Sequence, residues 1–180
     1  MLRTTRFLLG FIWLLCAAAS ATDLPPLTHG LNPIPTAPVA PHLSYLDMDD
    51  VEINLPDLAG QVVIVNFWAT WCPPCRREMS SLEKLRRAFE GEKVSILAVN
   101  IGEEFEDVFT FLGSVDPEPG FKVLFDHEAR SMQDWAIRGL PSTFIVTPDG
   151  RVRYRAVGGR EFDHPDIVTQ IRAMLKGASG

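Results

Sequence analysis

Residues 62–75 read VVIVNFWATWCPPC, and they say more about the architecture than any other stretch of the chain. The near-continuous apolar run from Val62 to Trp68 is typical of a strand buried on both faces. An amphipathic helix follows directly, and Cys72 and Cys75 stand at the junction. A strand that leads into a helix places unpaired N–H groups and the positive end of the helix dipole there, where they stabilise a thiolate. The stretch therefore predicts a reactive dithiol at the start of a helix.

Strand and helix signals alternate through the rest of the chain. The helix after the cysteines has apolar residues at helical spacing and stops at Gly91. Pro148-Asp149-Gly150 reads as a hairpin turn. The further elements that we expect are strands at 94–101, 121–125, 142–147 and 151–157, and helices at 105–112, at 131–137 and from about residue 167 to 175. The order β-α-β-α-β-α-β-β-α predicts a mixed sheet with helices on both faces.

The Cys-x-x-Cys spacing alone is ambiguous among a zinc half-site, a haem attachment point and a redox pair. Haem attachment needs a histidine after the second cysteine, where this chain has Arg76. Structural zinc needs further ligands. The histidines are scattered and show no ligand spacing, so we predict no metal site: they are His29, His42, His127 and His164. The strand–helix context favours the redox pair.

Residues 1–21 have the pattern of an export signal. Arg3 and Arg6 precede an apolar run from Phe7 to Ala19, and Ala19-Ser20-Ala21 suits cleavage after Ala21. The alternative is an uncleaved N-terminal membrane anchor. Export predicts a periplasmic location, which is an oxidising compartment. Cleavage would remove Cys16, leaving Cys72 and Cys75 as the cysteines of the mature chain.

Residues 22–44 are rich in proline and predict a flexible, loosely held arm in front of one domain at residues 45–177. The alternative is an arm packed along the surface of that domain. The chain has 180 residues and a formal net charge of -6, an acidic balance that argues against nucleic-acid binding.

Residues 65–75, VNFWATWCPPC, resemble the active-site segment of the thioredoxin superfamily. Residues 139–143, GLPST, resemble the cis-proline loop of that family and precede the predicted hairpin. The export signal, the helix at 105–112 and the continuation at 76–79 are similar to the exported TlpA/ResA/CcmG-like branch. This resemblance spans about residues 43–176. It implies a thioredoxin-like three-layer sandwich, with a central mixed β-sheet flanked by helices, and an enzyme that exchanges disulfides without an organic cofactor.

The resemblance also implies roles for individual residues. Cys72, at the exposed start of the helix, is expected to attack, and Cys75 to resolve the mixed disulfide. A cis bond before Pro141 would present the Leu140 backbone to an extended client segment beside Cys72. Trp71 is expected to offer the client a flat apolar surface, whereas Trp68 is equally compatible with the core; Met79 and Trp135 are expected to pack in the interior.

Two positions depart from ordinary thioredoxins. Asn66 stands where they carry a buried aspartate that moves the proton of the second thiol, which an amide cannot do. Glu78 follows Cys75 by three residues and so lies on the same side of the helix. It could take the proton of Cys75 if partial burial raises its pKa. The alternative is a solvated carboxylate paired with a nearby arginine.

The resulting hypothesis is a reductase of client-protein disulfides outside the cytoplasm. A membrane dithiol carrier would donate the electrons, and the clients would be of the apocytochrome c or copper-site assembly type. One alternative is a Cu(I) metallochaperone, because two thiolates suit that soft ion. Another is an oxidant that inserts disulfides. A peroxidase is disfavoured, because the thiols form a Cys-x-x-Cys pair.

Overall fold

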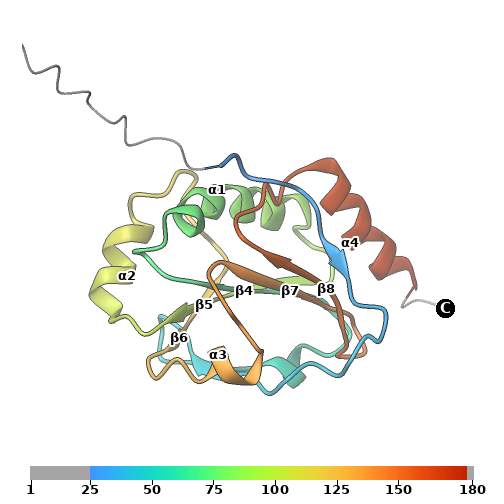
Figure 1. Ribbon diagram of the computed structural model, residues 1–180, viewed down its shortest axis with the longest axis horizontal. Coiled ribbons are helices and arrows are strands. Elements are labelled where there is room, and N and C mark those ends of the chain that lie inside the picture. The colour runs from blue at the N-terminus through green and yellow to red at the C-terminus, as the bar shows by residue number, and fades with distance from the viewer. Residues whose placement is uncertain (1–24, 178–180) are drawn as a thin grey trace, which may run out of the picture.

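A six-stranded mixed sheet forms the centre of the molecule, in the order β1-β8-β7-β4-β5-β6 (Figure 1). The computed structural model describes residues 25–177. The central strand β4 pairs parallel with β5 and antiparallel with β7. The strands of this sheet are β1 (Asn32–Pro33), β4 (Val62–Trp68), β5 (Val94–Ile101), β6 (Lys122–Asp126), β7 (Ser142–Val146) and β8 (Val152–Val157). The predicted mixed sheet between helices is confirmed.

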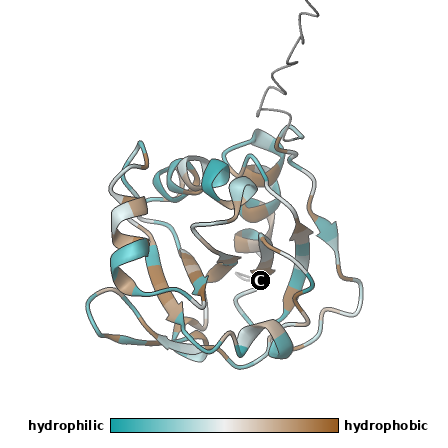
Figure 2. Cartoon of the chain, turned by 60° about the vertical axis from the view of Figure 1, so that its left-hand side comes forward, coloured by the Kyte–Doolittle hydropathy of each residue, from teal (hydrophilic) through white to brown (hydrophobic). Residues whose placement is uncertain are grey.

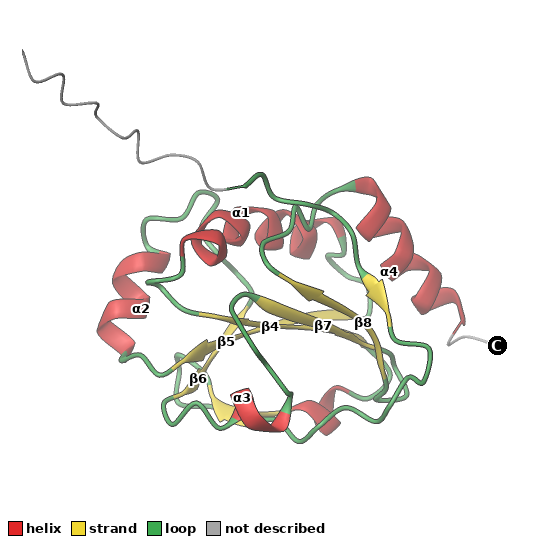
Figure 3. Cartoon of the chain, viewed as in Figure 1, coloured by secondary structure: helices red, strands yellow, loops and turns green. Residues whose placement is uncertain are grey.

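Helices cover both faces of this sheet, as Figure 3 shows by colour. One face packs against α1 (Pro73–Ala88), α2 (Phe105–Leu112) and α4 (Pro165–Gly177). The other face is covered by α3 (Ser131–Asp134), the 3-10 turn η1 (Leu55–Leu58) and a hairpin of β2 (Ser44–Leu46) and β3 (Glu52–Asn54). The alternation of β4 explains this arrangement, because successive residues of a strand point to opposite faces and both faces of β4 are apolar.

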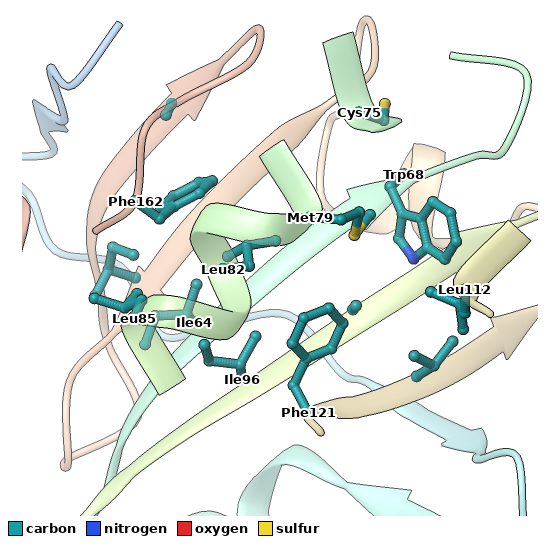
Figure 4. Packing of buried hydrophobic residues seen from close by; sticks show 14 of the residues in the cluster. Ile64, Trp68, Cys75, Met79, Leu82, Leu85, Ile96, Leu112, Phe121 and Phe162 are labelled. Carbon is teal, nitrogen blue, oxygen red and sulfur yellow. The ribbon is translucent and has the colours of Figure 1, made fainter. Parts of the chain in front are cut away.

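The packing between α1 and the sheet fixes the position of the cysteines. Met79, Leu82 and Leu85 lie on one side of α1 and are fully buried against Ile64 and Ile96 (Figure 4). Burial of each such side chain contributes about 1.5–3 kcal/mol relative to an exposed one. Hydrophobic residues correspondingly concentrate on the strands of the sheet, and hydrophilic residues on the helices and loops around it (Figure 2). The helix that begins at the cysteines is therefore held rigidly over β4.

The N-terminal strap, which we define as residues 25–43, differs from the expected flexible arm. It lies along the edge of the sheet, where β1 pairs with β8 and Ile34 N donates to Arg153 O at 2.8 Å (Figure 1). Leu31 and Leu43 anchor it in the two cores. Proline is compatible with an edge strand, because an outward-facing position needs no N–H donor. The prediction of a loosely held arm is thus wrong for this segment, and the alternative of a packed arm holds.

The predicted export signal or anchor at residues 1–21 lies outside the described residues. Within residues 25–177, no helix combines the length and the apolar character needed to span a membrane.

Candidate active site

The two cysteines form a disulfide at the start of α1, with the Sγ atoms 2.06 Å apart. Cys72 is the N-cap residue, and Pro73 and Pro74 occupy the first positions of the helix. These prolines have the backbone φ that a helix start requires and lack N–H groups that would have no partner there. Cys75 is fully buried, and Cys72 is only 3% exposed, because it packs into the core cluster under α1. Cys72 is therefore less accessible in the disulfide form than the sequence predicted.

The loop before β7 lies at the same end of the sheet as the disulfide. Phe67, near the end of β4, pairs with Ser142, the first residue of β7, so Pro141 adjoins the segment that leads to Cys72. The Leu140–Pro141 peptide bond is cis, as the resemblance implied. Pro141 is buried and Leu140 is half-buried.

The tryptophans that flank this segment differ in exposure. Trp71 is 67% exposed, directly before Cys72, and so presents an apolar surface to solvent. Trp68 is fully buried and packs against Phe111 of α2, which assigns it to the core. Met79 and Trp135 are buried, which confirms that both are packing residues.

Glu78 lies on α1 one turn beyond Cys75, and its side chain is fully buried. Its Oε1 accepts a hydrogen bond from Asn66 Nδ2 at 2.7 Å, and its Oε2 accepts one from the backbone N–H of Arg160 at 2.9 Å. Burial raises the pKa of Glu78 to about 8, although these two hydrogen bonds act in the opposite direction. The alternative of a solvated carboxylate is therefore wrong, and the burial is complete rather than partial.

Asn66 connects three elements beneath the disulfide. Its Nδ2 donates to Glu78 on α1 and also, at 2.9 Å, to Thr143 Oγ1 on β7, the strand that pairs with β4 at this position. The amide cannot exchange a proton, so it holds the carboxyl group of Glu78 in place without competing for its proton. The neutral Asn66 thereby leaves Glu78 as the titratable group below the cysteines.

Comparison with known proteins agrees with this geometry. Residues 37–155 match the AhpC/TSA family. The chain belongs to the AhpC/TSA family. It is 32% identical over 143 residues to the thiol-disulfide oxidoreductase ResA of Bacillus subtilis, covering 79% of each chain. The ResA of Geobacillus thermodenitrificans is 33% identical over 114 residues, covering 63% of this chain and 64% of the relative.

Solved structures of similar fold include that of a thiol:disulfide interchange protein, a thioredoxin family protein, from Chlorobium tepidum. It superimposes with a TM-score of 0.61 at 25% identity, covering 77% of this chain and 97% of that one. The predicted similarity to ResA-like members of the thioredoxin superfamily is thus confirmed. So is the predicted enzyme class: this AhpC/TSA family member is a thiol–disulfide oxidoreductase whose redox centre is the Cys72–Cys75 pair.

Glu103 is a member of the site that the sequence did not indicate. It follows β5, and its Oε2 accepts hydrogen bonds from the backbone N–H of Thr70 and from Asn100 Nδ2, both at 2.7 Å. Its Oε1 accepts a hydrogen bond from the hydroxyl of Thr70. Glu103 therefore fixes the loop that carries Trp71 and Cys72. Only the fold brings it to this loop, and no sequence spacing signals the contact.

The structure also corrects the description of the histidines as scattered. His29 of the strap and His164, which precedes α4, stack with ring centroids 3.7 Å apart, beside Asp166. His29 lies far from His164 and Asp166 in the sequence, so spacing gave no signal.

Proposed function

We propose that this thiol–disulfide oxidoreductase works outside the cytoplasm as a reductase of client-protein disulfides. The observation that carries the mechanism is a disulfide at the start of α1 with a fully buried carboxyl group of raised pKa one helical turn away. The predicted signal at residues 1–21 supports the location, and the resemblance to the exported branch supports the direction.

In the first step, the Cys72 thiolate attacks one sulfur of the client disulfide. The client S–S bond breaks, a mixed disulfide with Cys72 forms, and the second client sulfur leaves as a thiolate that takes a proton from water. The positive end of the α1 dipole stabilises the Cys72 thiolate. Because Pro73 and Pro74 lack N–H groups, the backbone N–H of Cys75 is the hydrogen-bond donor within the Cys-Pro-Pro-Cys motif that remains available to the Cys72 thiolate.

In the second step, Cys75 transfers its thiol proton to Glu78, and the resulting thiolate attacks Cys72. The bond from Cys72 to the client breaks, and the client sulfur leaves as a thiolate that takes a proton from water. Two electrons have then passed to the client, and the enzyme holds a disulfide. Glu78 then carries the proton, which its raised pKa of about 8 favours in this state. A membrane dithiol donor reverses the sequence: Cys75 leaves as a thiolate and recovers the proton from Glu78.

Trp71, Leu140 and Pro141 are the proposed client-binding residues. They lie on the two loops at the end of the sheet where Cys72 is found, and Trp71 is largely exposed. The proposed clients are the apocytochrome c or copper-site assembly proteins that the exported branch implies. Cleavage after Ala21 is part of this proposal, and mass spectrometry of the mature N-terminus distinguishes it from the alternative, a membrane tether through an uncleaved N-terminus.

The test is a Cys75→Ser variant expressed in its host. Without the resolving thiol, Cys72 stays attached to its clients, so we expect conjugates that dithiothreitol releases. The matched control is Cys72→Ser combined with Cys75→Ser, which has no attacking thiol. Exchange through Cys72 would be contradicted if conjugates were equally abundant in both variants, or if neither variant formed any.

The direction of exchange has a separate test, the reduction potential of the Cys72–Cys75 pair. A reductase is expected near the value of thioredoxin, about -270 mV, and a disulfide-inserting oxidant near about -120 mV. Competitive Cu(I) titration separates the metallochaperone: tight binding that Cys72→Ser abolishes, without reductase turnover, would favour it.

A further inference from the structure

A cluster of two imidazoles and one carboxylate lies where the strap crosses the start of α4. One ligand atom each from His29, His164 and Asp166 fall within 4.8 Å of one another. Asp166 Oδ2 is 3.4 Å from His29 Nε2 and 3.6 Å from His164 Nδ1. The disulfide chemistry uses none of these side chains.

The backbone on both sides of the cluster is fixed. Thr28 donates its N–H to Gly159 O and accepts a hydrogen bond from Glu161 N at 2.8 Å, and Gly30 O accepts one from Arg160 Nε, also at 2.8 Å. His29 thus lies between two residues that are bound to the segment leading into α4. That segment ends at His164, and the helix beginning at Pro165 carries Asp166.

We infer that His29, His164 and Asp166 form a binding site for a borderline divalent cation, of which Zn²⁺ and Cu²⁺ are the representatives. Two imidazoles with a carboxylate are a ligand set that suits these ions. Bonds of about 2.0–2.2 Å to nitrogen and oxygen place neighbouring ligand atoms of a tetrahedron about 3.3–3.6 Å apart. The observed separations from Asp166 Oδ2 to the two histidines lie in this range.

Binding requires the side chains to rotate, and His164 Nδ1 must give up the hydrogen bond that it accepts from the backbone N–H of Asp166 at 3.2 Å. The two rings are nearly parallel, whereas an ion bound to both must lie in both ring planes, so the stack has to open. The side chains of His29, His164 and Asp166 are 49%, 31% and 62% exposed, which leaves room for that rotation. The same exposure leaves the remaining coordination position to water or to a ligand from another molecule.

The site would clamp the strap to α4. A ligand that binds only the folded state stabilises the protein. Once the ligand concentration exceeds the dissociation constant, the stabilisation grows with the logarithm of the ratio of the two. We therefore expect Zn²⁺ to raise the unfolding temperature of the oxidised protein. Because the sulfurs of a disulfide are not available as thiolate ligands, this effect is independent of the Cys72–Cys75 pair.

The test uses oxidised protein purified without a histidine tag and titrated with Zn²⁺ in a calorimeter. We expect one ion per chain. His29→Ala and His164→Ala each remove a proposed ligand. Removal of a residue that only supports a metal ligand weakens binding roughly 10- to 100-fold, and we expect a loss of Zn²⁺ affinity at least this large for each variant. His42→Ala, which removes an exposed imidazole outside the cluster, is the matched control and should leave the affinity unchanged. With Cu²⁺, the electron paramagnetic resonance spectrum should carry hyperfine splitting from two imidazole nitrogens that either cluster variant reduces to one.

Two results would overturn the proposal: the absence of saturable binding, or equal affinity in the wild type, both cluster variants and Asp166→Asn. The former would leave the cluster as an ion pair of His29 and Asp166, and the latter would place the ion elsewhere. Thermal unfolding without metal shows whether each variant is folded before its affinity is compared.

Discussion

Two glutamates of α1 are both buried, and their environments are opposite. Glu83, in the middle of the helix, is 1% exposed and accepts hydrogen bonds from Arg86, Arg87 and the backbone N–H of Gly120 at 2.7–2.9 Å. Burial alone would raise the pKa of Glu83, but these donors outweigh it, and the pKa is lowered. This carboxylate is charged and joins α1 to the segment before β6.

Glu78, near the start of the helix, has weaker compensation, in which the charge of Arg160 acts at a distance. Its donors are the neutral amide of Asn66 and a backbone N–H, while the guanidinium of Arg160 binds the carbonyl groups of Gly30, Gly158 and Gly159. Burial prevails, and its pKa rises to about 8. The comparison teaches that the charge of the partners, rather than burial itself, separates a structural carboxylate from one that can exchange a proton near neutral pH.

The largest expected effect is on catalysis by Glu78→Gln. Loss of a general base typically costs about 10²- to 10⁴-fold, so release of a client from the mixed disulfide should slow by that factor and lose the pH dependence due to Glu78. Stopped-flow fluorescence of Trp71, beside Cys72, follows this step. Glu90→Gln, which removes an exposed acid after α1, is the control. A rate and pH profile like those of the wild type would remove Glu78 from the mechanism.

The second prediction concerns the stability of the oxidised protein against pH. A carboxyl whose pKa is higher in the folded state stabilises the fold at low pH, and this contribution is lost as the pH rises from about 4.5 through about 8. Each unit of pKa difference corresponds to about 1.4 kcal/mol, so the total is about 3–5 kcal/mol. Urea unfolding at pH 5 and pH 9 should therefore show a larger loss for the wild type than for Glu78→Gln. Parallel behaviour of the two proteins would contradict the raised pKa.

The third prediction is the opposite pH dependence of stability, due to Glu83. Breaking a buried ion pair costs about 3–5 kcal/mol, and the partial exposure of its arginines reduces the expected loss for Glu83→Gln to about 2–3 kcal/mol at pH 7. Because the pKa of Glu83 is lowered, this contribution is present above about pH 4.5 and is lost as the pH falls through the folded-state pKa. The unfolding curves of variant and wild type should converge in acid. A constant difference at all pH values would point to lost packing instead.

The smallest expected effect is that of Arg87→Ala. Its guanidinium lies 2.7 Å from Glu83, but the side chain is 53% exposed, so we expect a loss of only about 0.5–1 kcal/mol. High salt should reduce this difference between variant and wild type in denaturant unfolding. A loss as large as that of Glu83→Gln would mean that Arg87 alone keeps Glu83 ionised.

The strands and helices that pack around α1 could be predicted because their apolar patterns are local. The expected ranges 62–68, 94–101 and 105–112 coincide with β4, β5 and α2. The strap could not be predicted in the same way, since its prolines disfavour regular structure and its position depends on pairing with β8, far along the chain. Leu31 and Leu43 are its buried apolar residues, and their burial depends on the same packing.

The active site was predictable in its chemistry and less so in its environment. The sequence placed Cys72, Cys75 and Glu78 on one helix, but the complete burial of Glu78 depends on Arg160 and Asn66. Contacts of this kind, like those of Glu103 with Thr70 and of His29 with His164, arise only when distant segments pack together. The local periodicity of the sequence does not indicate such contacts.

The proposed mechanism requires that Glu78 hold a proton in the disulfide form near neutral pH. The most direct measurement is a ¹³C NMR titration of oxidised protein labelled at the glutamate side-chain carboxyl, with the Glu78 signal assigned by its absence from Glu78→Gln. We expect a midpoint near 8 for Glu78, against one below 4.5 for Glu83. A midpoint for Glu78 near the ordinary glutamate value of about 4.5 would contradict the proposed mechanism.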